Sequence, residues 1–320
     1  MKKAKLLGLL QERVFTLSVT IVIVSAVSAL VWPTKFPSAA NLSSVLLNVS
    51  TDAIVAVGMM ILLISGAFDL SVGSVVALSG GVTAHLMYYY GAHFTLAIAA
   101  GMGAALLVGL VNGVFVAKVG INPMIQTLAM MGIVRGCALM ASGAGIQNFP
   151  EAFNRIGQVR LLGLQSPIWF MAVIVLLFSV LVAKTVFFRR YYYIGGNEKA
   201  ATLSGIRVGR MRIIAFVLSA GLAGLAGILL AARFGAAMAS FGQGLELRVI
   251  TAVILGGASL RGGQGKIVGG FLGAVFMGLV KNIMIIARVD VYWQEIVLGV
   301  ILIIAVGIDV LLKKRSEKSA

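Results

Sequence analysis

The chain has 320 residues, of which 60% are hydrophobic and 11% charged, and its formal net charge is +16. A water-soluble domain of this composition would expose too much apolar surface, so the composition predicts a polytopic membrane protein. The basic residues lie in clusters beside uncharged apolar runs, which follows the positive-inside rule and argues against a nucleic-acid partner. The runs are continuously apolar rather than alternating, so the predicted class is all-α and not a β-barrel.

Ten apolar segments follow one another along the chain, and a helix needs about 20 residues to cross a bilayer. Two of them, Val249–Leu260 and Ile267–Val280, are too short, the first giving about 18 Å of helix. Either Glu246 and Arg248 enter the membrane, or these are broken helices that meet inside the protein, as in transporters. The sequence therefore predicts about ten membrane helices, some broken or re-entrant. The other segments are Val14–Val31, Leu42–Ser65, Val72–Tyr90, Phe94–Ala117, Met124–Ala141, Pro167–Phe187, Ile213–Arg233 and Gln294–Val310.

The pattern predicts one membrane domain over residues 1–320, with two helix groups at 13–186 and 213–312. A basic loop at 187–212 separates the groups, and a basic tail at 313–320 ends the chain. We expect both termini and this loop to be cytoplasmic, because basic clusters favour that side. The polar stretch Ser142–Ser166 is then the longest external segment, and it is either a surface for an external partner or an ordinary connection. The basic clusters are Lys2, Lys3, Lys5 and Arg13; Arg189, Arg190, Lys199, Arg207, Arg210 and Arg212; and Lys313, Lys314, Arg315 and Lys318.

A weak internal repeat relates Ser65–Ser74 to Leu255–Gln264 at a constant offset of 190 residues. The repeat places two glycine-broken segments in corresponding halves, which is typical of a translocation path. Asp69 lies between two apolar segments, and a carboxylate at membrane depth costs about 2.5–3.5 kcal/mol on insertion scales. It either lines a path for a polar solute or, with Ser71, caps the helix that begins near Val72. The predicted path residues are Asp69, Ser71, Gly73, Asn112, Gly256, Gly257, Ser259 and Asn282.

The sequence contains no pattern that supports an enzyme. The nearest approach to a phosphate-binding loop, Gly265-Lys266-Ile267, lacks both the hydroxyl residue and the earlier glycine that such a loop needs. The chain also has no HExxH or CxxC motif and a single cysteine, so no metal site is predicted. We expect the chain itself to bind no cofactor, and its spaced glycines to serve close helix packing.

The basic loop contains the pattern of a short helix. Gly195 and Gly196 precede Asn197, which suits an N-cap, and Glu198 suits the first helical turn. Gly205 is placed to end a helix over Glu198–Ser204. Such a helix on a cytoplasmic loop is either a docking element or part of a loop that only sets topology.

This loop resembles the cytoplasmic signature of carbohydrate ABC-importer permeases of the ribose, xylose and galactose type. The resemblance extends from about Asn41 to Asp309, through Ser65–Ser74, Ser219–Arg233 and Gly242–Gly265. Met124, Gln126 and Phe241 depart from the residues common in that family, near predicted membrane faces, where they would bear on which solute passes. The matching loop residues are Tyr193, Gly195, Gly196, Asn197, Glu198, Ala200, Ala201, Ser204, Gly205, Ile206 and Val208.

The resemblance implies a permease subunit in a bacterial inner membrane, coupled through the loop helix to separate cytoplasmic ATPase subunits that use ATP. It also implies a second permease chain, identical or different, and a periplasmic binding protein that delivers a sugar or sugar-like solute. Two alternatives stay open at this point. One is a branched-chain amino-acid permease of the same superfamily, and the other is an ion-driven secondary transporter.

Overall fold

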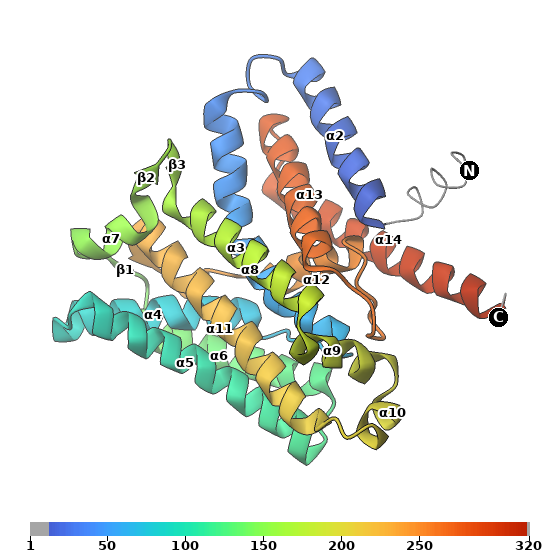
Figure 1. Cartoon of the computed structure of the whole chain (residues 1–320). Coiled ribbons are helices and arrows are strands. Elements are labelled where there is room, and N and C mark those ends of the chain that lie inside the picture. Colours follow the sequence, from blue (N-terminus) through green and yellow to red (C-terminus); the bar gives the residue numbers. More distant parts are fainter. Residues whose placement is uncertain (1–12, 319–320) are drawn as a thin grey trace.

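The computed structural model describes residues 13–318. For residues 308 and 310–318 it describes the backbone only. Lys2, Lys3 and Lys5 of the predicted N-terminal cluster lie outside the described residues. The described part contains the helices α2 (Arg13–Val31), α3 (Ala39–Ile64), α4 (Val72–Tyr90), α5 (Phe94–Val114), the π-helix η1 (Phe115–Val119), α6 (Pro123–Ser142), α7 (Glu151–Gln158), α8 (Ser166–Lys184), α9 (Val186–Gly196), α10 (Glu198–Leu203), α11 (Val208–Phe234), α12 (Leu245–Leu255), α13 (Ile267–Ile286) and α14 (Val291–Lys318) (Figure 1).

Seven helices of the described part are long and apolar enough to cross a membrane, namely α2, α3, α5 with η1, α6, α8, α11 and α13. The all-α, multi-pass prediction is confirmed, whereas the count of ten crossings is not. Helix α12, with 11 residues, is too short to cross, so the predicted break in this region is real. The expectation that the next segment ends near Val280 is wrong, because α13 is a helix of 20 residues that continues past Lys281 to Ile286. A lysine near a helix end extends its charged group to the interface while its stem packs against apolar neighbours.

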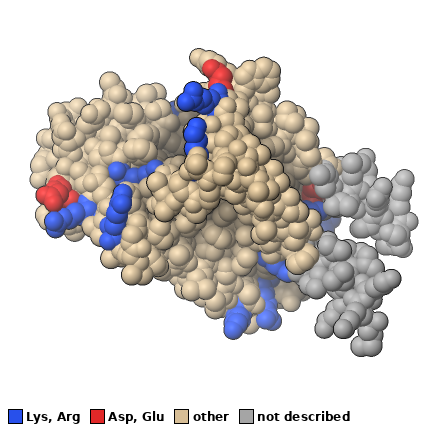
Figure 2. Space-filling model, turned by 90° about the horizontal axis from the view of Figure 1, so that it is seen from above, with Lys and Arg blue, Asp and Glu red and all other residues tan. Residues whose placement is uncertain are grey.

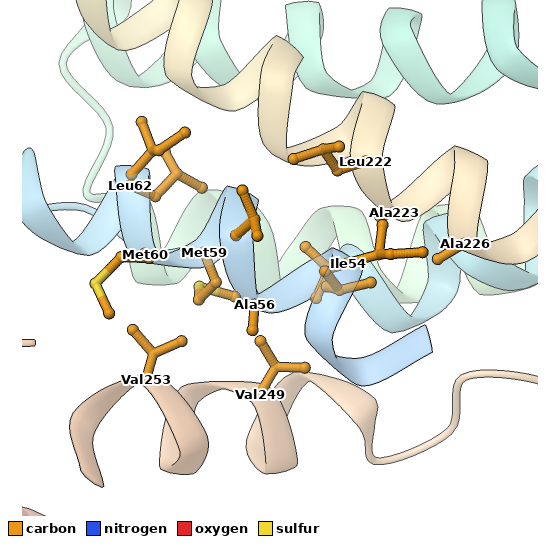
Figure 3. Packing of buried hydrophobic residues seen from close by; sticks show 14 of the residues in the cluster. Ile54, Ala56, Met59, Met60, Leu62, Leu222, Ala223, Ala226, Val249 and Val253 are labelled. Carbon is orange, nitrogen blue, oxygen red and sulfur yellow. The ribbon is translucent and has the colours of Figure 1, made fainter. Parts of the chain in front are cut away.

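Helix α3 forms the centre of the molecule. Most of its residues are buried, whereas α2 packs at the periphery and buries only Leu17 and Ser28. Figure 3 shows α3 between two other helices, with Leu222, Ala223 and Ala226 of α11 on one side and Val249 and Val253 of α12 on the other. The hydrophobic core is therefore built on one central helix whose neighbours come from the C-terminal half of the chain.

Glycines permit the closest helix contacts, as the small-residue pattern predicts. A Cβ atom on Gly109 of α5 would lie 2.6 Å from the carbonyl oxygen of Phe216 in α11. A Cβ on Gly113 would lie 2.8 Å from the Cα of Ile213. The glycines of α5 therefore set how closely α11 approaches it.

The predicted external stretch is ordered. Strand β1 (Ile146–Gln147) pairs with β4 (Ala236–Ala237), and β2 (Arg160–Leu161) pairs with β3 (Leu164–Gln165), both antiparallel. Between them α7 buries Phe153 and brings Gly157 against the backbone of Arg233. Charged side chains are sparse on the visible face in Figure 2, as expected for a molecule surrounded by lipid.

Candidate functional site

The loop 187–212 contains two short helices, and the short helix predicted in it is present. Helix α10 spans Glu198–Leu203, one residue shorter than predicted. The side chain of Asn197 accepts a hydrogen bond from the backbone N–H of Ala200 at 3.0 Å, so Asn197 is the N-cap. Gly205 follows with a φ of +82°, which a glycine adopts at little cost and which ends the helix.

Helix α10 is attached to the molecule on one side and free on the other. Ala201 is buried, and the guanidinium of Arg212 donates two hydrogen bonds, of 3.1 and 2.6 Å, to the carboxylate of Glu198. Leu203 is 90% exposed, so its side chain is available for contact with another protein. A groove of about 900 Å³ lies between α9, α10 and the start of α11, with Arg190, Arg207 and Arg210 in its lining. This largely exposed helix thus presents an apolar residue beside a basic groove.

The end of α9, just before α10, is in direct backbone contact with two distant parts of the chain. A Cβ atom on Gly195 would overlap the carbonyl oxygen of Ile64, at the end of α3, and the backbone nitrogen of Gly263. These two atoms are themselves joined by a hydrogen bond of 2.8 Å. A Cβ on Gly262 would lie 2.8 Å from the Cα of Gly195 and 2.9 Å from that of Gly66. We call this contact of Ile64, Gly66, Gly195, Gly262 and Gly263 the glycine junction.

A side-chain hydrogen bond reinforces the glycine junction. The hydroxyl of Tyr192 donates to the carbonyl oxygen of Gly265 at 2.7 Å. Burial raises the pKa of the Tyr192 phenol, so the group stays protonated and remains a donor near neutral pH. Helix α9 is therefore held against the loop between α12 and α13 by both backbone packing and a hydrogen bond.

The two halves of the internal repeat meet at the glycine junction, and the structure corrects their register. Gly66 ends α3 with a φ of +81°, and its counterpart after α12 is Gly257, with a φ of +96°, not Gly256. Beyond this point the offset of 190 holds: the Asp69 carboxylate accepts from Ser71 N at 2.7 Å, and the Ser259 hydroxyl accepts from Arg261 N at 3.1 Å. The loop after α12 is thus one residue shorter than the loop after α3. A comparison at a constant offset of 190 residues misses this difference.

Asp69 is fully buried and forms part of a polar chain between helices. Its carboxylate accepts hydrogen bonds from the backbone and the hydroxyl of Ser71, the latter at 2.6 Å. The amide of Asn112 in α5 donates to the Ser71 hydroxyl at 3.0 Å, and Gln126 in α6 donates to Asn112 at 3.3 Å. Asp69 makes a turn just before α4, whereas the N-cap residue Ser71 makes no side-chain cap bond. Both bonds are to Oδ1, whereas Oδ2 of Asp69 is buried and has no hydrogen-bond partner among the described residues.

The other predicted path residues are dispersed. Gly73 packs against the backbone of Gly242, and Gly256 packs against Gly269 in α13, so both serve close helix contacts. Ser259 is fully buried. Gly257 contacts Arg13 near a cavity of about 340 Å³.

Asn282 lies in a different region. It exchanges two hydrogen bonds, of 3.2 and 2.7 Å, with the side chain of Asn41, which joins α13 to the start of α3. Asn282 also lines a cavity of about 370 Å³ between α3, α11, α12 and α13. Of the predicted path residues, the structure therefore joins Asp69, Ser71 and Asn112 in one buried network and places Asn282 apart from them, at a separate cavity.

Sequence reasoning missed the other polar residues of this cavity. Arg248 in α12 donates to the carboxylate of Asp52 in α3 at 3.4 Å, and Arg233 at the end of α11 donates to the side chain of Asn48 at 2.9 Å. Asp52 carried a signal, because it is an acid inside a predicted apolar crossing. Its partner lies 196 residues further along the chain, so no local pattern could have identified it.

Comparison with known proteins places the chain in a family. Residues 41–306 match the family model described as "Branched-chain amino acid transport system / permease component". The ribose import permease protein RbsC of Escherichia coli strain K12 is 37% identical over 304 residues, covering 93% of each chain. The L-arabinose transport system permease protein AraH of the same strain is 40% identical over 276 residues, covering 86% of this chain and 84% of the relative. The ribose import permease protein RbsC of Bacillus subtilis strain 168 is 36% identical over 84% of each chain.

No solved structure was found to match the chain. The match to the family model extends over most of the chain and includes the loop helix, the glycine junction and the Asp69 network. The predicted resemblance is thereby confirmed: the chain belongs to the permease-component family of these transport systems and is a membrane-spanning transport subunit rather than an enzyme.

Proposed function

We propose that the chain forms the translocation path of an ATP-driven importer for a sugar or sugar-like solute. In this proposal ATP is used by separate cytoplasmic ATPase subunits, and a periplasmic binding protein delivers the solute to a pair of permease chains. The sugar specificity of the relatives favours this solute class over an amino acid. The amino-acid description of the family model covers the wider superfamily.

The single observation that carries the proposal is the glycine junction next to an exposed helix. Helix α10 exposes Leu203 beside a basic groove. Helix α9 ends directly before Asn197, the N-cap of α10, and is in backbone contact with the end of α3 and with the loop between α12 and α13. A displacement of α10 by an ATPase subunit would therefore move the inner ends of these membrane helices without a flexible linker. Packed interfaces respond to such a displacement by changing between discrete arrangements.

The arrangement of the termini supports the proposed cytoplasmic side and an inner-membrane location. Arg13, at the start of α2, forms an ion pair of 2.9 Å with Asp309 in the last helix. Arg13 also contacts Gly257 in the loop that joins α12 to α13, and this loop is in turn bonded to α9. The start of α2 and the end of α14 therefore lie on the same side of the molecule as the loop 187–212. The positive-inside rule places this side in the cytoplasm.

Binding of purified ATPase subunits to the chain in nanodiscs tests the docking surface. We expect Leu203→Ser to weaken binding at least about tenfold, since burying a leucine contributes about 1.5–3 kcal/mol. Leu162→Ser is the matched control, because Leu162 is also 90% exposed but lies in the turn between β2 and β3, in the predicted external stretch. Equal binding by the two variants would contradict the docking surface, and uptake in vesicles that contain no ATPase subunit would refute ATP-driven transport.

A further inference from the structure

The cavity of about 370 Å³ lies at the opposite end of the molecule from α10. It is bounded by the first half of α3, the last turn of α11, the start of α12 and the second half of α13. Its size lies within the range of about 300–1,000 Å³ that is typical of small-molecule sites. Three of its four walls, α3, α12 and α13, are the elements that meet the glycine junction at their other ends.

The polar lining combines donors and acceptors in close pairs. Asp52 accepts from Arg248 at 3.4 Å, and both side chains are about one-fifth exposed, so each keeps hydrogen-bonding positions open to the cavity. The Arg233 guanidinium donates to Asn48 at 2.9 Å, while Asn48 itself is exposed and keeps its amide N–H groups available. The Asn282 amide lies on the opposite wall.

An aromatic ring completes the lining. The Phe234 ring lies beneath the guanidinium of Arg233, with the Cζ atom 4.9 Å from the ring centroid. This contact fixes the planar guanidinium at the edge of the cavity. The cavity therefore presents planar hydrogen-bond donors and acceptors next to an apolar ring.

This combination fits a neutral polyhydroxyl solute. Each hydroxyl is both a donor and an acceptor, so it is satisfied by carboxylate, amide and guanidinium groups together. Lys281 also lines the cavity, so three basic side chains accompany the one carboxylate. The Asp52 oxygens, to which a neutral hydroxyl can donate and an anion cannot, are the feature that favours a neutral solute. We propose that this cavity is a binding site within the permease that holds the sugar on the outer side before it passes between the helices. The proposal rests on the function proposed above.

Saturation-transfer difference NMR on the full chain in nanodiscs tests the site, with D-ribose and L-arabinose as probes and D-ribose 5-phosphate as the anionic comparison. We expect saturation of at least one neutral sugar by the wild type. Asn48→Ala removes one exposed amide and should weaken binding about 3- to 10-fold. Asn48→Trp should abolish binding by filling the cavity. Gln147→Ala is the control, because Gln147 is an exposed polar residue of β1 that does not line the cavity.

Asp52→Asn distinguishes a sugar site from an anion site. We expect this variant to lose neutral-sugar saturation and to gain saturation of D-ribose 5-phosphate, because Arg248 loses its negative partner. Stronger saturation of the phosphate than of either sugar in the wild type would overturn the proposal. So would equal saturation of the sugars by the wild type and Asn48→Trp.

Uptake of radiolabelled D-ribose and L-arabinose by cells with the complete transporter separates the two proposals. If the wild type imports neither sugar, and no other sugar stimulates ATP hydrolysis, the proposed function fails. If the wild type imports a sugar and Asn48→Trp imports it with unchanged half-saturation, transport stands and the outer cavity is not its site.

Discussion

Replacement of Gly195 by alanine is the most direct test of the glycine junction. The added Cβ would overlap the carbonyl oxygen of Ile64 and the nitrogen of Gly263, which are backbone atoms and cannot rotate away. The backbone of α9, α3 or the α12–α13 loop must therefore shift. The 2.8 Å hydrogen bond between Gly263 and Ile64 lies at the point of overlap and would be lengthened or lost.

The structure sets the expected size of this effect. Overpacking a close contact costs about 1–3 kcal/mol. Loss of one buried hydrogen bond adds about 0.5–1.5 kcal/mol. We expect Gly195→Ala to lower the free energy of unfolding by about 1.5–4.5 kcal/mol, the sum of these two costs. Gly196→Ala is the matched control, because a Cβ on Gly196 meets no atom within 4 Å and alanine is the better helix former.

Two measurements check this prediction. Denaturation of the purified chain in detergent should show the loss for Gly195→Ala and an unchanged or slightly raised stability for Gly196→Ala. In the reconstituted transporter, the stimulation of ATP hydrolysis by loaded binding protein should fall for Gly195→Ala alone. If the two variants behave alike in both measurements, the reasoning from backbone contact is refuted.

Three further predictions concern the cap, the buried network and helix packing. Asn197→Ala removes the N-cap of α10 and should reduce helix stability by about 1 kcal/mol, seen as faster amide exchange in α10 and weaker ATPase binding, with Asn197→Asp retaining both. Ser71→Ala removes a hydroxyl donor from the Asp69 carboxylate and should lower the free energy of unfolding by about 1–3 kcal/mol in a denaturant titration; an unchanged midpoint would contradict the network. Gly109→Leu should prevent α5 from packing on α11 and reduce the yield of folded protein, whereas Gly103→Leu, in open space on the same helix, should leave the yield unchanged.

The structure of the loop 187–212 could be predicted almost completely from the sequence, since it is set by local chemistry. Asn197 caps α10 because its side chain reaches a backbone N–H three residues later, and Gly205 ends it because a left-handed residue is needed there. Both requirements can be recognised in a short window of sequence. The role of the helix as a docking element stays a prediction.

Other features depend on contacts between distant segments, and the sequence did not reveal them. Helix α13 continues past Lys281 because apolar residues on both sides of the lysine pack against neighbouring helices. The prediction ended the segment at the charge, although Ile267–Ile286 as a whole is apolar enough to cross a membrane. The pairing of Asp52 with Arg248 joins α3 to α12 across 196 residues. Gln126 was noted only as a departure from the family pattern, and its position next to Asn112 became apparent from the packing of α6 against α5.

The glycine junction gives the internal repeat a structural meaning. Each repeat unit ends a helix at a left-handed glycine, Gly66 or Gly257, and then makes a turn closed by a side chain, Asp69 or Ser259. The end of α3 and the loop after α12, through Gly262 and Gly263, can approach the same glycine of α9 only if no side chain lies between them, which is why the contact surface consists of backbone atoms. A junction of this kind has little room to adjust gradually, because backbone atoms in contact cannot move past one another without breaking the Gly263–Ile64 hydrogen bond. The two helix ends should therefore move together with α9 as one unit, and the changes in shape that admit a solute should occur further out, around the cavity lined by Asp52 and Arg248.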